Sequence, residues 1–191
     1  MPLDLLDPTA TDSDSLYEVI DGRVVLASDE SVAAAVVRNR LADRLNERTF
    51  RSSGIAYANM LFKLPLPADR NRRPDVAFVP FTVWPRTRPL PNTNAWTALP
   101  ALCVEVVSPT DLAEEVMTKV TEYLSAGVKL VWVVCPMPQV VIAFDSPTTA
   151  KVYGRTDPVP ADPVVPGFAF ELSDLIPNGE EEAEDTTAQA L

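Results

Sequence analysis

The sequence predicts a single mixed α/β domain of the α+β kind, in which helices flank a central β-sheet. The chain has 191 residues, of which 47% are hydrophobic, and this supplies one substantial core but hardly two. Strand-like and helix-like segments follow one another as a β-hairpin, a helix, three strands, a helix and two strands. This order differs from the strict alternation of a doubly wound fold and favours a mixed sheet.

The first predicted elements are a β-hairpin and a long helix. Asp21 and Gly22 separate the strand-like segments 17–20 and 24–26, and this dipeptide favours the positive φ angles of a type I′ turn. Ser28 or Asp29 is expected to cap a helix that ends at about Ser53, before Gly54. The apolar side chains expected to face the core at helical spacing are Val32, Val36, Leu41 and Leu45.

The middle of the chain supplies two strands and a long loop. The runs IAYANMLFKL and PDVAFVP indicate strands that are separated by a loop from Pro65 to Arg73. Residues 80–100 are interrupted by proline and contain Trp84 and Trp96. A loop of this length suggests a functional or interface excursion, and it could cover the contact surface of a homodimer.

The last third predicts a strand, a helix and a pair of strands. ALCVEVVSP is rich in β-branched residues, and a helix is expected from Thr110 to Ala126, where Gly127 ends it. The runs VKLVWVVCP and QVVIAF then indicate two more strands.

The two ends of the chain differ in composition from the part between them. Residues 1–15 are rich in Asp, Thr, Ser and Pro, and residues 177–191 are acidic without aromatic residues. Such compositions are typical of solvated tails. The folded domain is therefore expected to span residues 16–176.

Deletion of the acidic segment from Glu180 onward is expected to leave the thermal midpoint of unfolding nearly unchanged. The segment has no apolar periodicity, so burial cannot offset the entropy of ordering it. Thermal unfolding of the full and the shortened chain measures this effect. A midpoint lowered by many degrees would show instead that the segment docks on the domain.

Composition excludes several kinds of chemistry. The chain has no His, which rules out Ser-His-Asp hydrolysis, HNH-type nucleases and zinc sites with histidine ligands. Cys103 and Cys135 lie inside apolar runs and are expected to be buried thiols in a reducing compartment. No secretory leader and no run of about 18 apolar residues is recognisable. A cytoplasmic protein without a membrane anchor is expected.

The charge balance is acidic. The net charge is −11, and residues 1–179 still carry −6 when the five acids of the last twelve residues are set aside. This argues against nonspecific binding of polyanions, because such binding depends on Lys and Arg that neutralise phosphates. It leaves room for a locally basic cleft.

Two acidic residues stand in otherwise apolar strands. Glu105 is the only charge in LCVEVV, where period two places it on the face of Cys103, and burial of its carboxylate is costly without a partner. Asp75 opens a strand directly after Pro74. Taken singly, Glu105 is equally well explained by an edge strand with a solvated face or by a structural ion pair, and Asp75 is better explained by a turn. Taken together, they could converge on a divalent cation such as Mg²⁺.

Lys119 lies at the boundary between the apolar and the polar face of the second predicted helix. On a helical wheel it stands near Tyr123 and borders Glu115 and Glu122. One interpretation is a surface pair with Glu115 at i,i+4 spacing. The other is that its ammonium group extends past the apolar stripe toward the carboxylates of the sheet.

Six segments of the chain together resemble one known family. In order, they are YEVIDGRVV, RRPDVAFV, VEVVSPTD, KVTEY, AGVKLVWVV and VPGFAFEL. Over residues 16–176 this collinear set resembles the Uma-type family of putative restriction endonucleases, formerly a domain of unknown function, in the PD-(D/E)XK nuclease superfamily. The resemblance implies a restriction-endonuclease-like core, with a mixed central sheet and flanking helices.

The resemblance also implies catalytic residues. Asp75 falls on the aspartate of the PD motif, and Glu105 falls on the acid of the following strand. The superfamily usually has a lysine two residues after that acid, where this chain has Val107. The Uma-type sequences resemble a variant of the superfamily in which this lysine lies on the next helix instead, and Lys119 occupies that position. Glu18 matches a family acid that faces the same site.

The implied chemistry is hydrolysis of a phosphodiester. Asp75 and Glu105, with the backbone carbonyl of Val106, would hold Mg²⁺ or Mn²⁺ against the scissile phosphate. Lys119 would orient the attacking water or stabilise the developing charge.

Residues near these positions receive supporting roles. Arg70, Arg72 and Arg73 precede Asp75 and could bind the substrate backbone, with a solvated surface loop as an equal alternative. Ser108 and Asp111 match a family turn, where helix capping is their expected task.

The expected function is therefore a metal-dependent endonuclease that acts on DNA. Two alternatives stay open. The first is a non-catalytic binding or assembly protein that keeps the fold, which the acidic charge favours, and the second is a phosphodiesterase that acts on RNA or nucleotides.

Overall fold

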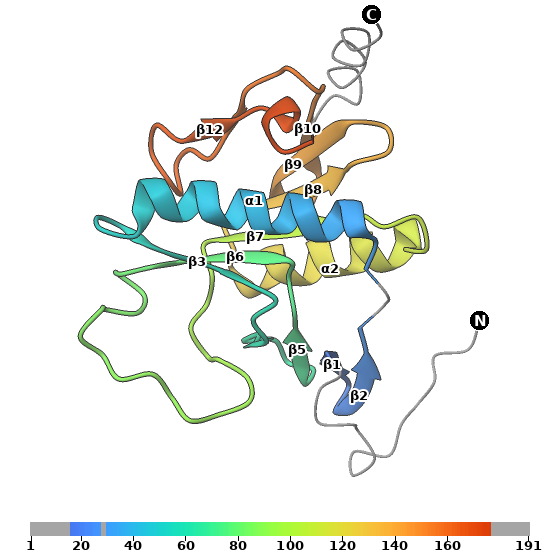
Figure 1. Ribbon diagram of the computed structural model, residues 1–191. Helices are drawn as coiled ribbons and strands as arrows, with labels where there is room; N and C mark the ends of the chain where they lie inside the picture. Colours follow the sequence, from blue (N-terminus) through green and yellow to red (C-terminus); the bar gives the residue numbers. More distant parts are fainter. Residues whose placement is uncertain (1–15, 28–29, 177–191) are drawn as a thin grey trace, which may run out of the picture.

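The centre of the protein is a six-stranded mixed sheet. The computed structural model describes residues 16–27 and 30–176, so the expected tails and the expected caps Ser28 and Asp29 lie outside these residues. The strand order is β10-β9-β8-β7-β6-β3 (Figure 1). The strands are β3 (Gly54–Ala58), β6 (Val76–Pro80), β7 (Leu102–Val106), β8 (Leu130–Cys135), β9 (Val140–Ser146) and β10 (Thr149–Tyr153). Strands β7 and β8 are parallel, and the other neighbours are antiparallel.

Two helices cover opposite faces of this sheet. Helix α1 (Val32–Thr49) packs on β3, β6 and β7, and helix α2 (Ala113–Ala126) connects β7 to β8 and packs on β8 and β9. Val104 and Val106 belong to the core on the α1 side, whereas Cys103 belongs to the core on the α2 side. Because side chains alternate along a strand, Glu105 faces α2, as period two predicts. In the described residues, no helix has the length and apolar character to cross a membrane.

A smaller, four-stranded sheet lies beside the large one (Figure 1). Its order is β2-β1-β5-β4, with β1 (Tyr17–Ile20), β2 (Arg23–Leu26), β4 (Phe62–Lys63) and β5 (Arg70–Arg72). Asp21 and Gly22 have φ angles of 53° and 74°, as a type I′ turn requires. The predicted hairpin is confirmed. The predicted loop over residues 65–73 is wrong in part, because β5 forms there by pairing with β1 and β4.

The first helix is shorter than predicted, and the face that it buries differs in part from the predicted one. Its N-cap is Ser31, whose Oγ accepts a hydrogen bond from the Ala34 N–H at 3.2 Å, and it ends at Thr49 rather than near Ser53. Val32 is 82% exposed, while Val37 is buried. The predicted face is thus correct for Leu41 and Leu45 but wrong for Val32 and Val36.

The second helix begins three residues later than predicted. Asp111 Oδ2 accepts a hydrogen bond from the Ser108 N–H at 2.8 Å, which stabilises the turn before the helix. Ser108 Oγ accepts a hydrogen bond from the Ser31 N–H at 3.1 Å, so this hydroxyl lies at the start of α1. The helix ends at Gly127, which has a φ angle of 102°, and this left-handed cap confirms the predicted end.

The long loop over residues 80–100 is anchored on its own domain. Trp96 is 5% exposed, and the centre of its ring lies 5.3 Å from that of Tyr57, 5.8 Å from that of Phe62 and 5.2 Å from that of Trp84.

The described part of the chain closes with β11 (Val159–Pro160), β12 (Ala169–Phe170) and a 3₁₀ turn over Leu172–Asp174.

Candidate active site

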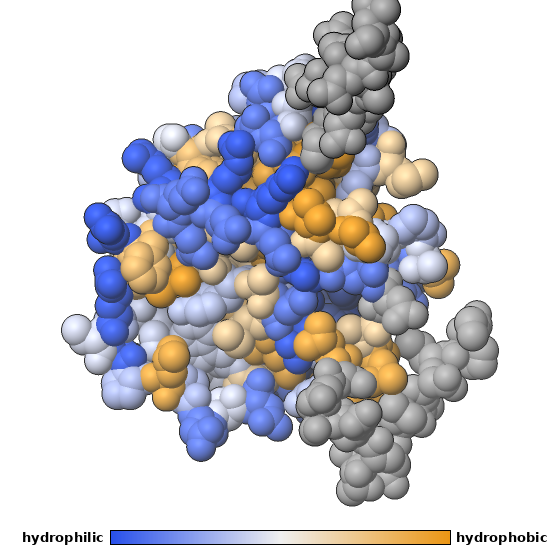
Figure 2. All heavy atoms as spheres, in the orientation of Figure 1, coloured by the Kyte–Doolittle hydropathy of each residue, from blue (hydrophilic) through white to orange (hydrophobic). Residues whose placement is uncertain are grey.

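A cleft opens between the β1–β2 hairpin, strand β5 and helix α2. Its volume is about 540 Å³, within the range of sites that bind small molecules. Three exposed leucines lie along it, and Figure 2 shows hydrophobic residues gathered over the hairpin. They are Leu16, Leu26 and Leu112. All the residues that the sequence analysis expects to be catalytic or to bind the substrate backbone also line the cleft.

Two carboxylates lie opposite each other in the cleft. Val76 of β6 pairs with Val104 of β7, so the next positions outward, Asp75 and Glu105, also face each other across the two strands. Asp75 Oδ2 accepts a hydrogen bond from the Val106 N–H at 2.6 Å. Burial and the negative charge of Glu105 raise the pKa of Asp75 to about 7. Burial also raises the pKa of Glu105, which is 6% exposed.

Two side chains of α2 hold Glu105. Lys119 Nζ donates a hydrogen bond to Glu105 Oε2 at 3.0 Å, and the Tyr123 hydroxyl donates one to Oε1 at 2.7 Å. Burial opposes the charge of Lys119, but Glu105 and Glu18 outweigh it and raise the pKa of the ammonium group. Lys119 is therefore a cation in the cleft.

Glu18 links the hairpin to the same site. Its Oε1 lies 3.5 Å from Lys119 Nζ and accepts a hydrogen bond from the Arg73 N–H at 2.9 Å. Its Oε2 lies 2.7 Å from Arg72 Nη1. The structure thus brings together around one cleft all four residues predicted to be catalytic, namely Glu18, Asp75, Glu105 and Lys119.

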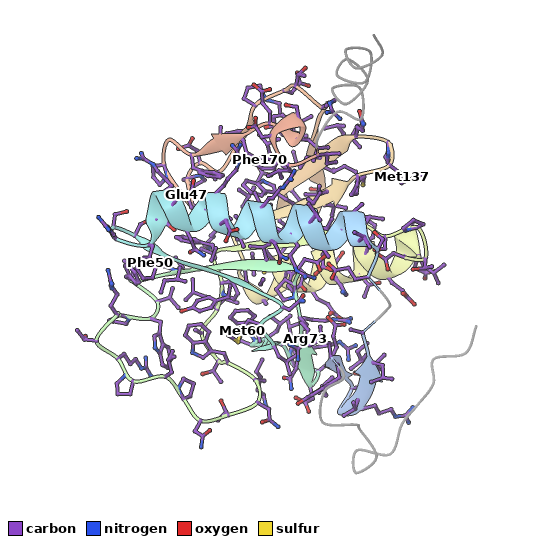
Figure 3. The ribbon with its side chains drawn as sticks, in the orientation of Figure 1. Glu47, Phe50, Met60, Arg73, Met137 and Phe170 are labelled. Atoms are coloured by element: carbon purple, nitrogen blue, oxygen red, sulfur yellow. The ribbon has the colours of Figure 1, made fainter. Side chains whose placement is uncertain are left out.

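The three arginines expected to bind the substrate backbone line the cleft, but their guanidinium groups have partners within the protein. Arg72 is 5% exposed, and its Nε lies 2.5 Å from Glu122 Oε2. Arg70 Nε lies 2.7 Å from Glu122 Oε1, and its Nη1 lies 2.7 Å from Asp21 Oδ1. Arg73, which is labelled in Figure 3, donates a hydrogen bond from Nε to the Tyr17 carbonyl at 3.1 Å. In this arrangement they brace β1, β5 and α2 against one another.

The structure decides between the two interpretations of Lys119 and adds two residues that the sequence did not indicate. Lys119 forms ion pairs with Glu105 and Glu18, and no pair with Glu115 is present in the described residues. By its position on the helix, Tyr123 belongs to the apolar stripe. Only its spacing of four residues from Lys119 could have indicated that both side chains bind Glu105. Glu122 binds Arg70 and Arg72 about 50 positions away, and no local pattern indicates such a contact.

Replacement of Tyr123 by Phe is expected to lower the free energy of unfolding by about 1–2 kcal/mol, because a buried carboxylate oxygen loses its donor. The ring itself, which is fully buried, would keep its packing. Urea unfolding at neutral pH measures the change. An unchanged free energy of unfolding would show that the hydroxyl contributes nothing to holding Glu105.

A divalent cation fits the donor set that Asp75 and Glu105 offer in the cleft. Asp75 and Glu105 offer hard oxygen ligands from neighbouring strands. Burial is the largest cause of the raised Asp75 pKa, and repulsion by the Glu105 carboxylate is the second. Within the described residues, no group of three or more His, Cys, Asp or Glu side chains could hold a metal ion. A cation here would therefore depend on two carboxylates, backbone oxygen and water, a set that suits Mg²⁺.

Comparisons with known proteins concern the family and the fold of the chain. Residues 3–173 match the model of the Uma2 family, which is described as a putative restriction endonuclease. No curated protein matches the chain. A crystal structure of a putative nuclease belonging to DUF820, from Anabaena variabilis, aligns with a TM-score of 0.75 at 16% identity and covers 87% of this chain and 93% of that chain. This likeness shows a shared fold and confirms the predicted restriction-endonuclease-like core.

Proposed function

The chain belongs to the Uma2 family of putative restriction endonucleases, and from this premise we propose that it is a divalent-metal-dependent endonuclease that hydrolyses DNA phosphodiester bonds. One observation carries the proposal. The half-buried Asp75 and the buried Glu105 face each other from neighbouring strands in one cleft, and the ammonium group of Lys119 lies 3.0 Å from Glu105. Carboxylates that bind a cation and a lysine beside them are the parts that phosphodiester hydrolysis requires without histidine.

Asp75 and Glu105 are the residues that would hold Mg²⁺ or Mn²⁺, together with the backbone oxygen of Val106. When bound, the cation would offset the phosphate charge and supply a more acidic water molecule. The Val106 N–H holds Asp75 through its Oδ2, and Tyr123 holds Glu105 through its Oε1. These contacts fix both carboxylates before substrate arrives, as an effective site requires.

Lys119 supplies a positive charge beside the acid pair. Its ammonium group carries three donors, and Glu105 and Glu18 lie 3.0 and 3.5 Å from it. Its charge would stabilise the negative charge that develops at phosphorus. Glu18 of the hairpin, which is itself held by Arg72 of β5, positions this ammonium group.

The proposal is tested by cleavage of supercoiled plasmid and of circular single-stranded DNA in the presence of Mg²⁺ or Mn²⁺. The wild type is expected to cut, and Glu105→Gln is expected to cut at least a hundred-fold more slowly. Glu47→Gln is the matched control, because Glu47 is exposed on α1 outside the cleft and forms no ion pair in the described part of the chain.

Two outcomes would contradict the proposal. If the wild type cuts neither DNA with any divalent metal ion, the protein is better explained as a non-catalytic module that keeps the fold. If Glu105→Gln cuts as fast as the wild type, the cleavage comes from another site or from a contaminating nuclease.

A further inference from the structure

A second surface lies at the other end of β6 from the acid pair. Asp75 immediately precedes β6, and the chain leaves the strand at Pro80. There the Phe81 N–H donates a hydrogen bond to the Ser53 carbonyl at 2.9 Å, so the loop after β6 lies beside the turn that follows α1. We call this area the basic–aromatic surface, and it consists of Phe50, Arg51, Trp84, Arg86 and Arg88.

Rings and guanidinium groups contact each other on this surface. Arg86 Cζ lies 5.0 Å from the centre of the Phe50 ring, and its Nη1 donates a hydrogen bond to the Phe50 carbonyl at 3.2 Å. Arg88 Cζ lies 3.8 Å from the centre of the nearest Trp84 ring. Phe50 is 46% exposed, and Figure 3 labels it at the C-terminal end of α1, away from Arg73 in the cleft. The exposed guanidinium groups therefore lie beside one exposed ring, that of Phe50, and one half-buried ring, that of Trp84.

The positive charge of this surface is not compensated within the described residues. Arg51, Arg86 and Arg88 are exposed, and none of them forms an ion pair there. Residues 48–68 and 76–104 contain no acid at all, although the chain carries a net charge of −11. The cleft arginines Arg70 and Arg72, by contrast, are paired with carboxylates. The nearest acid along the chain is Glu47 in the last turn of α1. Arginines that form no ion pair attract a polyanion.

We propose that the basic–aromatic surface binds single-stranded nucleic acid and holds it beside the cleft, an inference that rests on the proposed nuclease function. Arginine pairs with phosphate groups, and unpaired bases stack on exposed rings and on guanidinium planes. The five residues of β6 span about 17 Å at about 3.3 Å per residue. This distance corresponds to about five nucleotides of a stacked strand at 3.4 Å each.

The test is equilibrium binding of a fluorescent 20-nucleotide oligothymidine, measured by anisotropy in EDTA over a range of KCl concentrations. Arg86→Ala with Arg88→Ala is expected to weaken binding at least ten-fold and to reduce the salt dependence of log Kd by about 1.4, because two phosphate contacts are lost. Arg23→Ala with Lys129→Ala is the matched control, since both side chains are exposed outside the surface. The control is expected to change Kd less than two-fold.

A stacking variant separates base contacts from charge. Phe50→Leu is expected to weaken oligothymidine binding at least five-fold with an unchanged salt dependence, because a base loses its stacking partner. A duplex of the same length is expected to bind more weakly than the single strand. Equal loss of binding in the matched control, or tighter binding of the duplex, would overturn the assignment.

Failure of this inference is distinguishable from failure of the proposed function. Binding is measured without metal, so a protein that cuts nothing can still bind the single strand through Arg86 and Arg88. Hydrolysis of bis(p-nitrophenyl) phosphate, which is too small to reach the surface from the cleft, is expected to be unchanged in the double arginine variant. An enzyme that cuts single strands but binds them independently of Arg86 and Arg88 would overturn the surface alone.

Discussion

Replacement of Lys119 by Met is expected to lower metal-dependent cleavage of DNA at least a hundred-fold. The ammonium group lies 3.0 Å from Glu105 and 3.5 Å from Glu18, and Met keeps most of the volume of the stem while it removes the charge. An interaction that strengthens as charge develops at phosphorus accelerates the reaction itself, so its loss lowers kcat. The effect should appear in kcat, with a smaller effect on metal affinity.

The measurement compares wild type, Lys119→Met and Lys129→Met in the same plasmid assay. Lys129 is an exposed lysine outside the cleft, so its replacement controls for the loss of one positive charge. A Lys119→Met protein that cuts as fast as the wild type would confine this lysine to holding Glu105 and Glu18 in place.

The same substitution also has a structural consequence. A surface pair with Glu115 would contribute well under about 1 kcal/mol, but the observed partners are the buried Glu18 and Glu105. Without Lys119, Glu18 keeps Arg72 and Glu105 keeps Tyr123. We therefore expect a loss of about 1–3 kcal/mol in the free energy of unfolding in EDTA. Urea unfolding of Lys119→Met and Lys129→Met measures it, and equal values in both variants would contradict it.

Replacement of Asp75 by Asn is expected to abolish metal binding and to stabilise the metal-free protein above neutral pH. Burial and Glu105 raise the Asp75 pKa from 3.8 to about 7. The folded chain therefore binds this proton more tightly than the unfolded chain does, and the wild type loses stability as the pH rises from about 4 to about 7. Asn keeps an acceptor for the Val106 N–H and has no charge to repel Glu105.

Two measurements check this expectation. Urea unfolding in EDTA should show the stability of Asp75→Asn relative to wild type increasing by about 2 kcal/mol between pH 5 and pH 8. Calorimetric titration with Mn²⁺ should show binding to the wild type and none to the variant. Asp69→Asn is the control, since Asp69 lies on the exposed loop and pairs with Lys63 at 3.7 Å. Equal Mn²⁺ binding in wild type and Asp75→Asn would exclude the site.

Much of the fold follows from local sequence patterns. The Asp21-Gly22 turn, the end of α2 at Gly127 and the alternation of Cys103, Val104 and Glu105 depend on backbone preferences of a few adjacent residues. The same patterns failed where tertiary contacts decide. Strand β5 exists because β1 and β4 flank it, and Val32 is exposed although its spacing suits a core position.

The candidate site divides in the same way. The sequence alone indicated Asp75 and Glu105, because a carboxylate in or beside an apolar strand requires a partner. For Lys119 it left two interpretations. Only the tertiary structure decided that Lys119 extends to Glu105 and Glu18, that Tyr123 holds Glu105, and that Glu122 binds Arg70 and Arg72. These contacts join residues up to about 100 positions apart. Their strength comes from burial beside a charged partner, and neither burial nor the identity of a distant partner is encoded in the spacing of neighbouring residues.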